Sequence, residues 1–132
     1  MTEAEINKQA RRNCARLQKM LRLGDWRVEV HTAPLDADFG QCVLMPEYRS
    51  ARITISSVLH RTPDQLLATC VHEMLHLSLG ALEGFEAVLT VALKDEDALR
   101  RTLQVALVQA VEASVTALEG PLAALYKEQW SD

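Results

Sequence analysis

Apolar residues recur every three or four positions from Thr2 to Leu23, a spacing that predicts an amphipathic helix. Its apolar side consists of Ile6, Ala10, Cys14 or Asn13, Leu17 and Leu21, with Gly24 expected to stop it. Its other side is basic and carries Lys8, Arg11, Arg12, Arg16, Lys19 and Arg22. A solvated face is the simpler interpretation, because bases toward the end of a helix also suit its dipole.

Apolar and polar residues alternate in the segments that follow, which predicts strands with one buried face. The first strand is expected at Trp26 to Thr32, the second at Phe39 to Met45 and the third at Arg49 to Ser56. A loop over residues 33–38 separates the first two, and a turn at Pro46-Glu47-Tyr48 joins the last two. The second and third strands are therefore close enough to form a hairpin.

A helical pattern returns from Thr62 to Gly80, and this stretch organises the rest of the prediction. Thr62 is a suitable N-cap, Pro63 suits the first helical position, and Gln65 would complete a capping box with Thr62. Apolar residues from Leu66 to Leu77 form one broad side. Gly80 is expected at the end of the helix as its C′ residue.

The chain beyond Gly80 gives a mixed signal. Residues 81–94 are compatible with a loop, a short strand or the start of a helix. A long helix is predicted from about Asp97 to Leu118, closed by Gly120-Pro121. A short terminal helix should follow, docked through Leu122, Leu125 and Trp130.

Composition restricts the class of protein. The chain has 132 residues, of which 48% are hydrophobic and 24% charged, so we expect one folded domain covering residues 1–132. A net charge of −4 gives no overall attraction to nucleic acid or to anionic membranes. Three widely spaced cysteines form no C-x-x-C pair and indicate a reducing compartment. No signal peptide or membrane span is visible, so a soluble cytoplasmic protein is expected.

Candidate chemistry is concentrated in His72-Glu73-Met74-Leu75-His76. Residues at i and i+4 project from the same face of a helix, so the two imidazoles could bind one metal ion such as Zn²⁺. Glu73 points about 100° away, where it could accept a proton from a metal-bound water. The structural alternative is an amphipathic helix that happens to carry two histidines and a glutamate.

A catalytic zinc site needs a third protein ligand. Glu112 is a candidate because it stands among apolar residues, where an unpaired carboxylate is costly. The alternative for this residue is a wet helix stripe formed by Thr102, Gln109, Glu112, Thr116 and Glu119. Glu83, with Glu86 behind it, is the main competitor as ligand. His31 and His60 lack a partner at ligand spacing and are expected to be exposed strand or loop residues.

The run from Trp26 to Leu77, about half of the chain, resembles the zincin metallopeptidases in their small gluzincin-like form. It looks most like the compact metallopeptidases encoded by phages and prophages, and more distantly like SprT-like proteins, although the cysteine zinc ribbon of many of these is absent. The likeness rests on Trp26, on the run from Tyr48 to Ile55, on Thr62-Pro63 and on Val71 to Leu77. The metzincin form does not fit, because Leu82 stands six residues after His76.

The resemblance implies a single α+β zincin-like domain in which a twisted three-stranded sheet covers the active-site helix. The N-terminal helix would pack behind the sheet, the Phe39 to Met45 strand would form its antiparallel edge, and the long C-terminal helix would close the site. It also implies a third ligand on a later helix, a position that Glu112 suits.

The implied activity is zinc-dependent hydrolysis of a peptide or protein substrate, with Glu73 as general base. Tyr48, His60 or Tyr126 could assist at the oxyanion. Two other functions stay open. One is an inactive zinc-binding assembly or host-interaction module, and the other is a nucleic-acid-associated adaptor that uses the basic face of the first helix.

Overall fold

The protein is mixed α+β, as predicted, in a computed structural model that describes residues 1–131 except the side chains at positions 81 and 83. Its elements begin with α1 (Glu3–Met20), β1 (Arg27–Ala33) and β2 (Gly40–Met45). A 3₁₀ turn, η1 (Pro46–Tyr48), leads into β3 (Ser50–Ser56). The helices α2 (Pro63–Ser78), α3 (Gly80–Ala92) and α4 (Asp97–Gln129) complete the order. All three predicted strands are therefore present, within one residue at either end.

The sheet has the order β1-β3-β2, with β1 parallel and β2 antiparallel to the central β3. The predicted hairpin of the second and third strands is confirmed, and so is the expected antiparallel edge position of β2. Val30, Ile53 and Cys42 pair side by side across the three strands and belong to one core. Alternation along each strand thus gives the sheet one face that is packed against helices.

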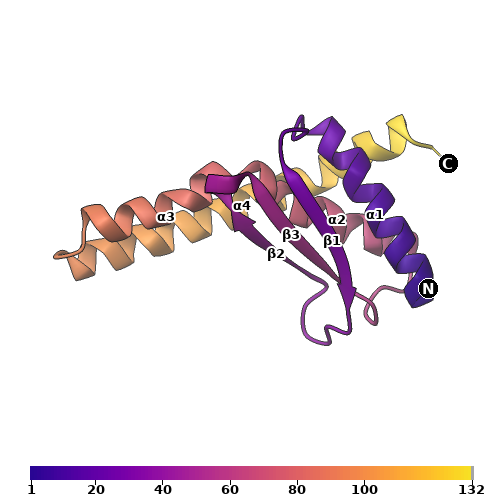
Figure 1. The fold of residues 1–132 in the computed structure, drawn as a ribbon, viewed down its shortest axis with the longest axis horizontal. Coiled ribbons are helices and arrows are strands. Elements are labelled where there is room, and N and C mark those ends of the chain that lie inside the picture. Colours follow the sequence, from indigo (N-terminus) through magenta and orange to yellow (C-terminus); the bar gives the residue numbers. More distant parts are fainter. Residues whose placement is uncertain (132) are drawn as a thin grey trace.

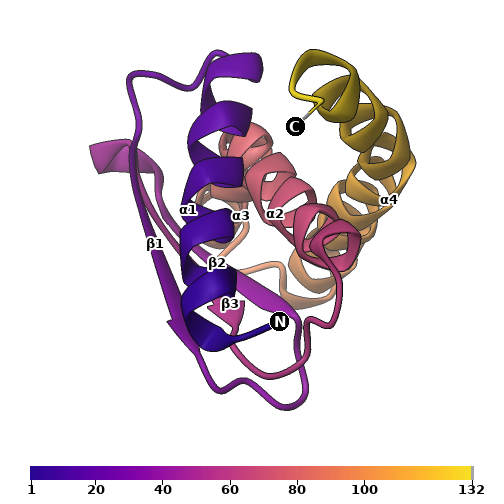
Figure 2. The ribbon, with the colours of Figure 1, turned by 90° about the vertical axis from the view of Figure 1, so that its right-hand side faces the viewer.

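Both α1 and α2 cover this same face of the sheet (Figure 2). The core joins Ile6 and Leu17 of α1 with Leu66 and Met74 of α2, all of them fully buried. The expectation that the N-terminal helix packs behind the sheet is wrong. The reason is that the apolar side of α1 packs against α2 and β1 in the same core.

Threonine caps begin the first two helices. Thr2 and Glu5 form a full capping box on α1. The Thr62 hydroxyl accepts a hydrogen bond from Gln65 N at the start of α2. The predicted capping box at Thr62 is incomplete, because the Gln65 side chain accepts from Arg61 N instead.

Neither glycine predicted to stop a helix does so through a left-handed conformation. Arg22 takes the positive φ, 55°, after α1. Gly80 is the first residue of α3, where a Cβ would lie 3.4 Å from Leu44 and 3.6 Å from Trp26. These are ordinary contact distances, so a larger residue would fit here, and Gly80 does not act as a C′ stop.

The ambiguous stretch after Gly80 is helical, and α3 and α4 form a hairpin that extends beyond the sheet (Figure 1). The predicted break at Gly120-Pro121 is wrong, since α4 continues through Pro121 to Gln129. A proline inside a helix removes a backbone hydrogen bond, so contacts elsewhere must offset that loss.

The end of α4 is held against α1 by an aromatic and polar cluster. The Arg16 guanidinium donates to the Tyr126 hydroxyl at 3.3 Å and lies 5.3 Å from the Trp130 ring centroid. The Tyr126 hydroxyl in turn donates to Asn13 at 2.7 Å. Leu122 and Trp130 join the core as expected, whereas Leu125 is 55% exposed, contrary to expectation. These contacts offset the loss at Pro121.

None of the helices within residues 1–131 combines the length and the apolarity that crossing a bilayer requires.

Candidate metal site

The two histidines of the motif lie one turn apart on α2 and face the same side. Their ring centroids are 5.0 Å apart, with the ring planes inclined by 58°. The His72 side chain is 34% exposed and that of His76 is 15% exposed. Because α2 is anchored by buried residues on both sides of the motif, the backbone under the two rings is well supported.

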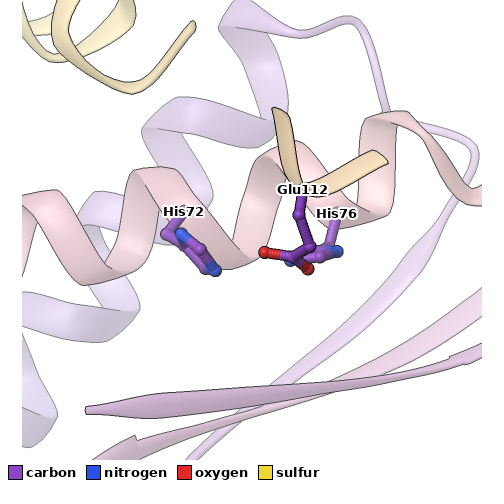
Figure 3. A group of neighbouring side chains, drawn as sticks. All are labelled: His72, His76 and Glu112. Atoms are coloured by element: carbon purple, nitrogen blue, oxygen red, sulfur yellow. The ribbon is translucent and has the colours of Figure 1, made fainter. Parts of the chain in front are cut away.

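Glu112 reaches the histidine pair from α4, which crosses beside α2 (Figure 3). Its Oε1 lies 3.2 Å from Nε2 of His76. One ligand atom from each of His72, His76 and Glu112 lies within 4.8 Å of the other two. The structure therefore brings together the three residues that the sequence selected as ligands.

The competing glutamates are placed differently. The Glu83 side chain lies outside the described residues. Glu86 is exposed on α3 and lines, with Leu107, Val108, Val111 and Glu112, a small cavity of about 190 Å³ between α3 and α4. Glu86 is not in the group of residues that could share a metal ion, as far as the described side chains go.

A second carboxylate of α4 contacts the pair. An oxygen of Glu119 contacts Nδ1 of His72, and the Glu119 side chain is 32% exposed. The sequence showed Glu119 only as part of a wet stripe. Its spacing of seven residues from Glu112 puts the two carboxylates on one face of α4, but no local pattern links Glu119 to His72.

Glu73 lies beside the histidines in a cleft between the start of β2 and α2. The cleft has a volume of about 350 Å³ and is lined by Asp38, Phe39, Gly40, Ala68, Thr69, His72, Glu73 and Glu119. Glu73 is 5% exposed and is among the few buried charged residues. A carboxylate withdrawn from water in this way is an effective hydrogen-bond acceptor for a group that enters the cleft.

Close approach of β2 to Glu73 depends on Gly40. A Cβ at this position would lie 2.8 Å from Cγ2 of Thr69 and 3.3 Å from Oε1 of Glu73. The first of these distances is too short for any side chain. Gly40 thus permits the strand edge to pass directly over the carboxylate.

The remaining histidines differ from one another. His31 is exposed on β1, as predicted, and lies 3.5 Å from Glu29. His60 is 3% exposed, so its predicted exposure is wrong. Its ring nitrogens contact Ser56 O and Thr69 Oγ1, each at 2.8 Å. Both nitrogens are thus used within the fold, which explains how a histidine is accommodated in the interior.

None of the three residues considered for the oxyanion is among the described residues that line the cleft. Tyr48 is 75% exposed on η1. His60 uses both ring nitrogens as described above. The Tyr126 hydroxyl is engaged by Arg16 and Asn13. Any further stabilisation of an oxyanion must therefore come from other groups.

The three cysteines are free thiols, with Cys14 and Cys70 buried. Contact with Cys70, followed by burial, raises the pKa of the Cys14 thiol well above its usual range. Repulsion from the charge of Glu73 also contributes to the raised pKa. None of these thiols is in the group of described residues that could share a metal ion.

Comparisons of the chain with protein-family models, with curated proteins and with solved structures give no match.

The donor set fits a zinc ion chemically. Two imidazoles and one carboxylate, with a fourth position left for solvent, form a known catalytic zinc set. In a tetrahedral site with bonds of about 2.1 Å, neighbouring ligand atoms are about 3.4 Å apart. The pair His76–Glu112 is already at 3.2 Å, and no pair of ligand atoms exceeds 4.8 Å. Small side-chain rotations would thus suffice to bring all three atoms to bonding distance.

Proposed function

We propose that the protein is a zinc-dependent peptidase that binds the metal through His72, His76 and Glu112 and uses Glu73 as general base. The observation that carries the proposal is that Glu112, from a distant helix, comes within metal-sharing distance of His72 and His76. His72 also lines the cleft that contains Glu73. Two histidines at helical spacing are common, but a third ligand brought to them by a different helix is a much more restrictive feature.

The chain's own residues divide the work of peptide hydrolysis. Zinc, when bound, supplies the positive charge that acidifies a water molecule and polarises the scissile carbonyl. Glu73 accepts the proton of the attacking water and passes it to the leaving amine. Glu73 lines the same cleft as His72, which favours this role.

The edge strand β2 provides a place for the substrate. Within the described residues β2 pairs only with β3, so its other edge is open to an extended peptide. A peptide added beside Gly40 would run past the cleft that contains Glu73. We therefore propose an unstructured peptide segment, bound as an extra strand, as the substrate class.

The decisive experiment replaces Glu73 with glutamine. The zinc-loaded wild type should cleave unstructured peptides, detected by mass spectrometry. Glu73→Gln should still bind one zinc ion per chain but lose turnover by about 10²-fold or more, because the general base is removed. The matched control is Glu47→Gln, which removes an exposed carboxylate from η1 and should leave turnover unchanged. Wild-type turnover in Glu73→Gln would contradict the proposal.

A second candidate is a metal-binding module without turnover. It is favoured by the position of the ligands on α2 and α4, since a metal shared by the two helices would cross-link them and stabilise the fold. A wild type that binds one zinc ion, gains thermal stability and cleaves no peptide would support this alternative.

The nucleic-acid adaptor function would use the basic face of α1, and one residue of that face is engaged elsewhere. Arg16 packs on Tyr126 and Trp130, so it belongs to the contact between α1 and α4. The exposed part of the basic face is thus smaller than the sequence suggested, and no structural observation favours this function.

A further inference from the structure

The two carboxylates that α4 presents to the histidines meet different ring nitrogens. Glu112 approaches Nε2 of His76. Glu119 contacts Nδ1 of His72 and is not in the group that could share a metal ion, within the part of the chain that the structure describes. The two glutamates are therefore not equivalent.

The contact with Glu119 fixes the protonation pattern of the His72 ring. An ionised carboxylate only accepts hydrogen bonds, so the atom it meets, Nδ1, must carry a proton. In a neutral imidazole the other nitrogen, Nε2, then holds the free lone pair. This lone pair is what a metal ion needs.

The same contact restricts the rotation of the His72 ring. His72 is more exposed than His76, at 34% against 15%, so neighbouring side chains hold it less. A hydrogen bond from Nδ1 to a residue of another helix supplies the missing restraint. Carboxylates bonded to the outer nitrogen of a metal-binding histidine typically strengthen binding in this way.

We propose that Glu119 is a positioning residue for His72: it accepts the Nδ1 proton, holds the ring and presents Nε2 to the metal. This inference rests on the proposed metal site. It assigns to α4 two separate contributions, a ligand at Glu112 and an orienting acceptor two turns later at Glu119. The competing explanation is an ion pair that only fastens α4 to α2.

The test measures zinc affinity in variants of Glu119 that remain folded without metal. In Glu119→Ala the affinity for zinc, measured by competition with a chelator at fixed pH, should fall about 10- to 100-fold. The isosteric Glu119→Gln keeps an acceptor and should lose less. The Co²⁺-loaded variants should retain the visible absorption intensity of a site with three protein ligands, whereas Glu112→Ala should change it.

The control is Glu128→Ala, which removes another exposed carboxylate of α4 and should change neither affinity nor spectrum. Nitrogen NMR of the metal-free wild type should also show His72 protonated at Nδ1, with this preference lost in Glu119→Ala. A purely structural ion pair does not predict loss of affinity in a variant that remains folded.

Three outcomes would overturn the inference. If Glu119→Ala bound zinc as tightly as the wild type, the contact between Glu119 and His72 would be only an ion pair that fastens α4 to α2. A Co²⁺ spectrum changed as strongly as in Glu112→Ala would make Glu119 a ligand. A wild type that binds no zinc would instead reject the metal site itself, and with it the proposed function, so the two failures are distinguishable.

Discussion

The helices α2 and α3 follow one another directly in the chain, yet they are packed in opposite ways. In α2, Leu66, Cys70, Val71 and Met74 are fully buried between the sheet, α1 and α4. In α3, large apolar side chains remain in contact with water: Phe85 is 49% exposed, Val88 53% and Val91 76%. The apolar side of α2 is therefore fully buried, whereas that of the hairpin of α3 and α4 is buried only in part.

This difference explains how the candidate site is supported. The histidines stand on the covered helix, where rigid packing fixes their spacing. Along α4, Val105 and Val108 are exposed while Val111 and Val115 are buried, so Glu112 lies where the helix leaves the hairpin and joins the core. Glu119 lies within the covered section. A site built on rigid elements is better defined than one on a projecting segment.

The largest expected effect comes from shortening one apolar side chain in each region. Met74→Ala empties a fully buried position of α2 and should lower the free energy of unfolding by about 2–5 kcal/mol. Val91→Ala removes methyl groups that are already in water and should change it by less than about 0.5 kcal/mol. Chemical denaturation measures both. Equal losses would mean that the hairpin is covered in solution.

Glycine-to-alanine changes should have opposite signs in the two regions. Gly40→Ala forces a Cβ against Thr69 and should destabilise the protein by about 1–3 kcal/mol. Gly84→Ala lies inside α3, where its Cβ would meet Pro46 only at 3.7 Å. Because alanine is the better helix former, this change should stabilise by about 0.5–1 kcal/mol.

A companion variant checks the cause at Gly40. Thr69→Ser removes the methyl group that the new Cβ would meet but retains the hydroxyl that contacts His60. In this background Gly40→Ala should cost less free energy of unfolding. An unchanged cost would show that the short contact with Thr69 is not the reason.

The smallest effect concerns the helix starts. The N-cap of α2 has a side-chain hydrogen bond from Gln65 N to Thr62, whereas Glu96 makes none at the start of α4. Thr62→Ala should therefore cost about 1 kcal/mol, and Glu96→Ala less than about 0.5 kcal/mol, in thermal or chemical unfolding. A larger loss at Glu96 would contradict the difference in capping.

Local patterns predicted most of the elements. Alternation defined the three strands, and a cap followed by helical spacing defined α2, since both signals depend on neighbours in sequence. The errors arose where distant packing decides. Pro121 is tolerated because Tyr126 and Trp130 hold α4 against α1. At Gly80 the chain enters α3 directly and does not end in a left-handed stop.

The site was predictable in part for the same reason. His72, Glu73 and His76 form a local motif. Glu112 was a candidate because it stands among apolar residues, but its side chain is 52% exposed, so its nearness to the histidines, and not costly burial, supports it as a ligand. Glu119 could not be paired with His72 from the sequence, because that contact depends on how α2 and α4 align. The burial of His60 could not be predicted either, because it depends on the contacts of its ring with Ser56 and Thr69 in the folded chain.

The central claim is that His72, His76 and Glu112 hold one metal ion. Crystals grown with zinc and measured at the zinc absorption edge test this most directly. We predict one anomalous peak about 2.0–2.2 Å from a ring nitrogen of each histidine and from a carboxylate oxygen of Glu112. A zinc ion bound elsewhere, or none at these rings at saturating zinc, would contradict the account.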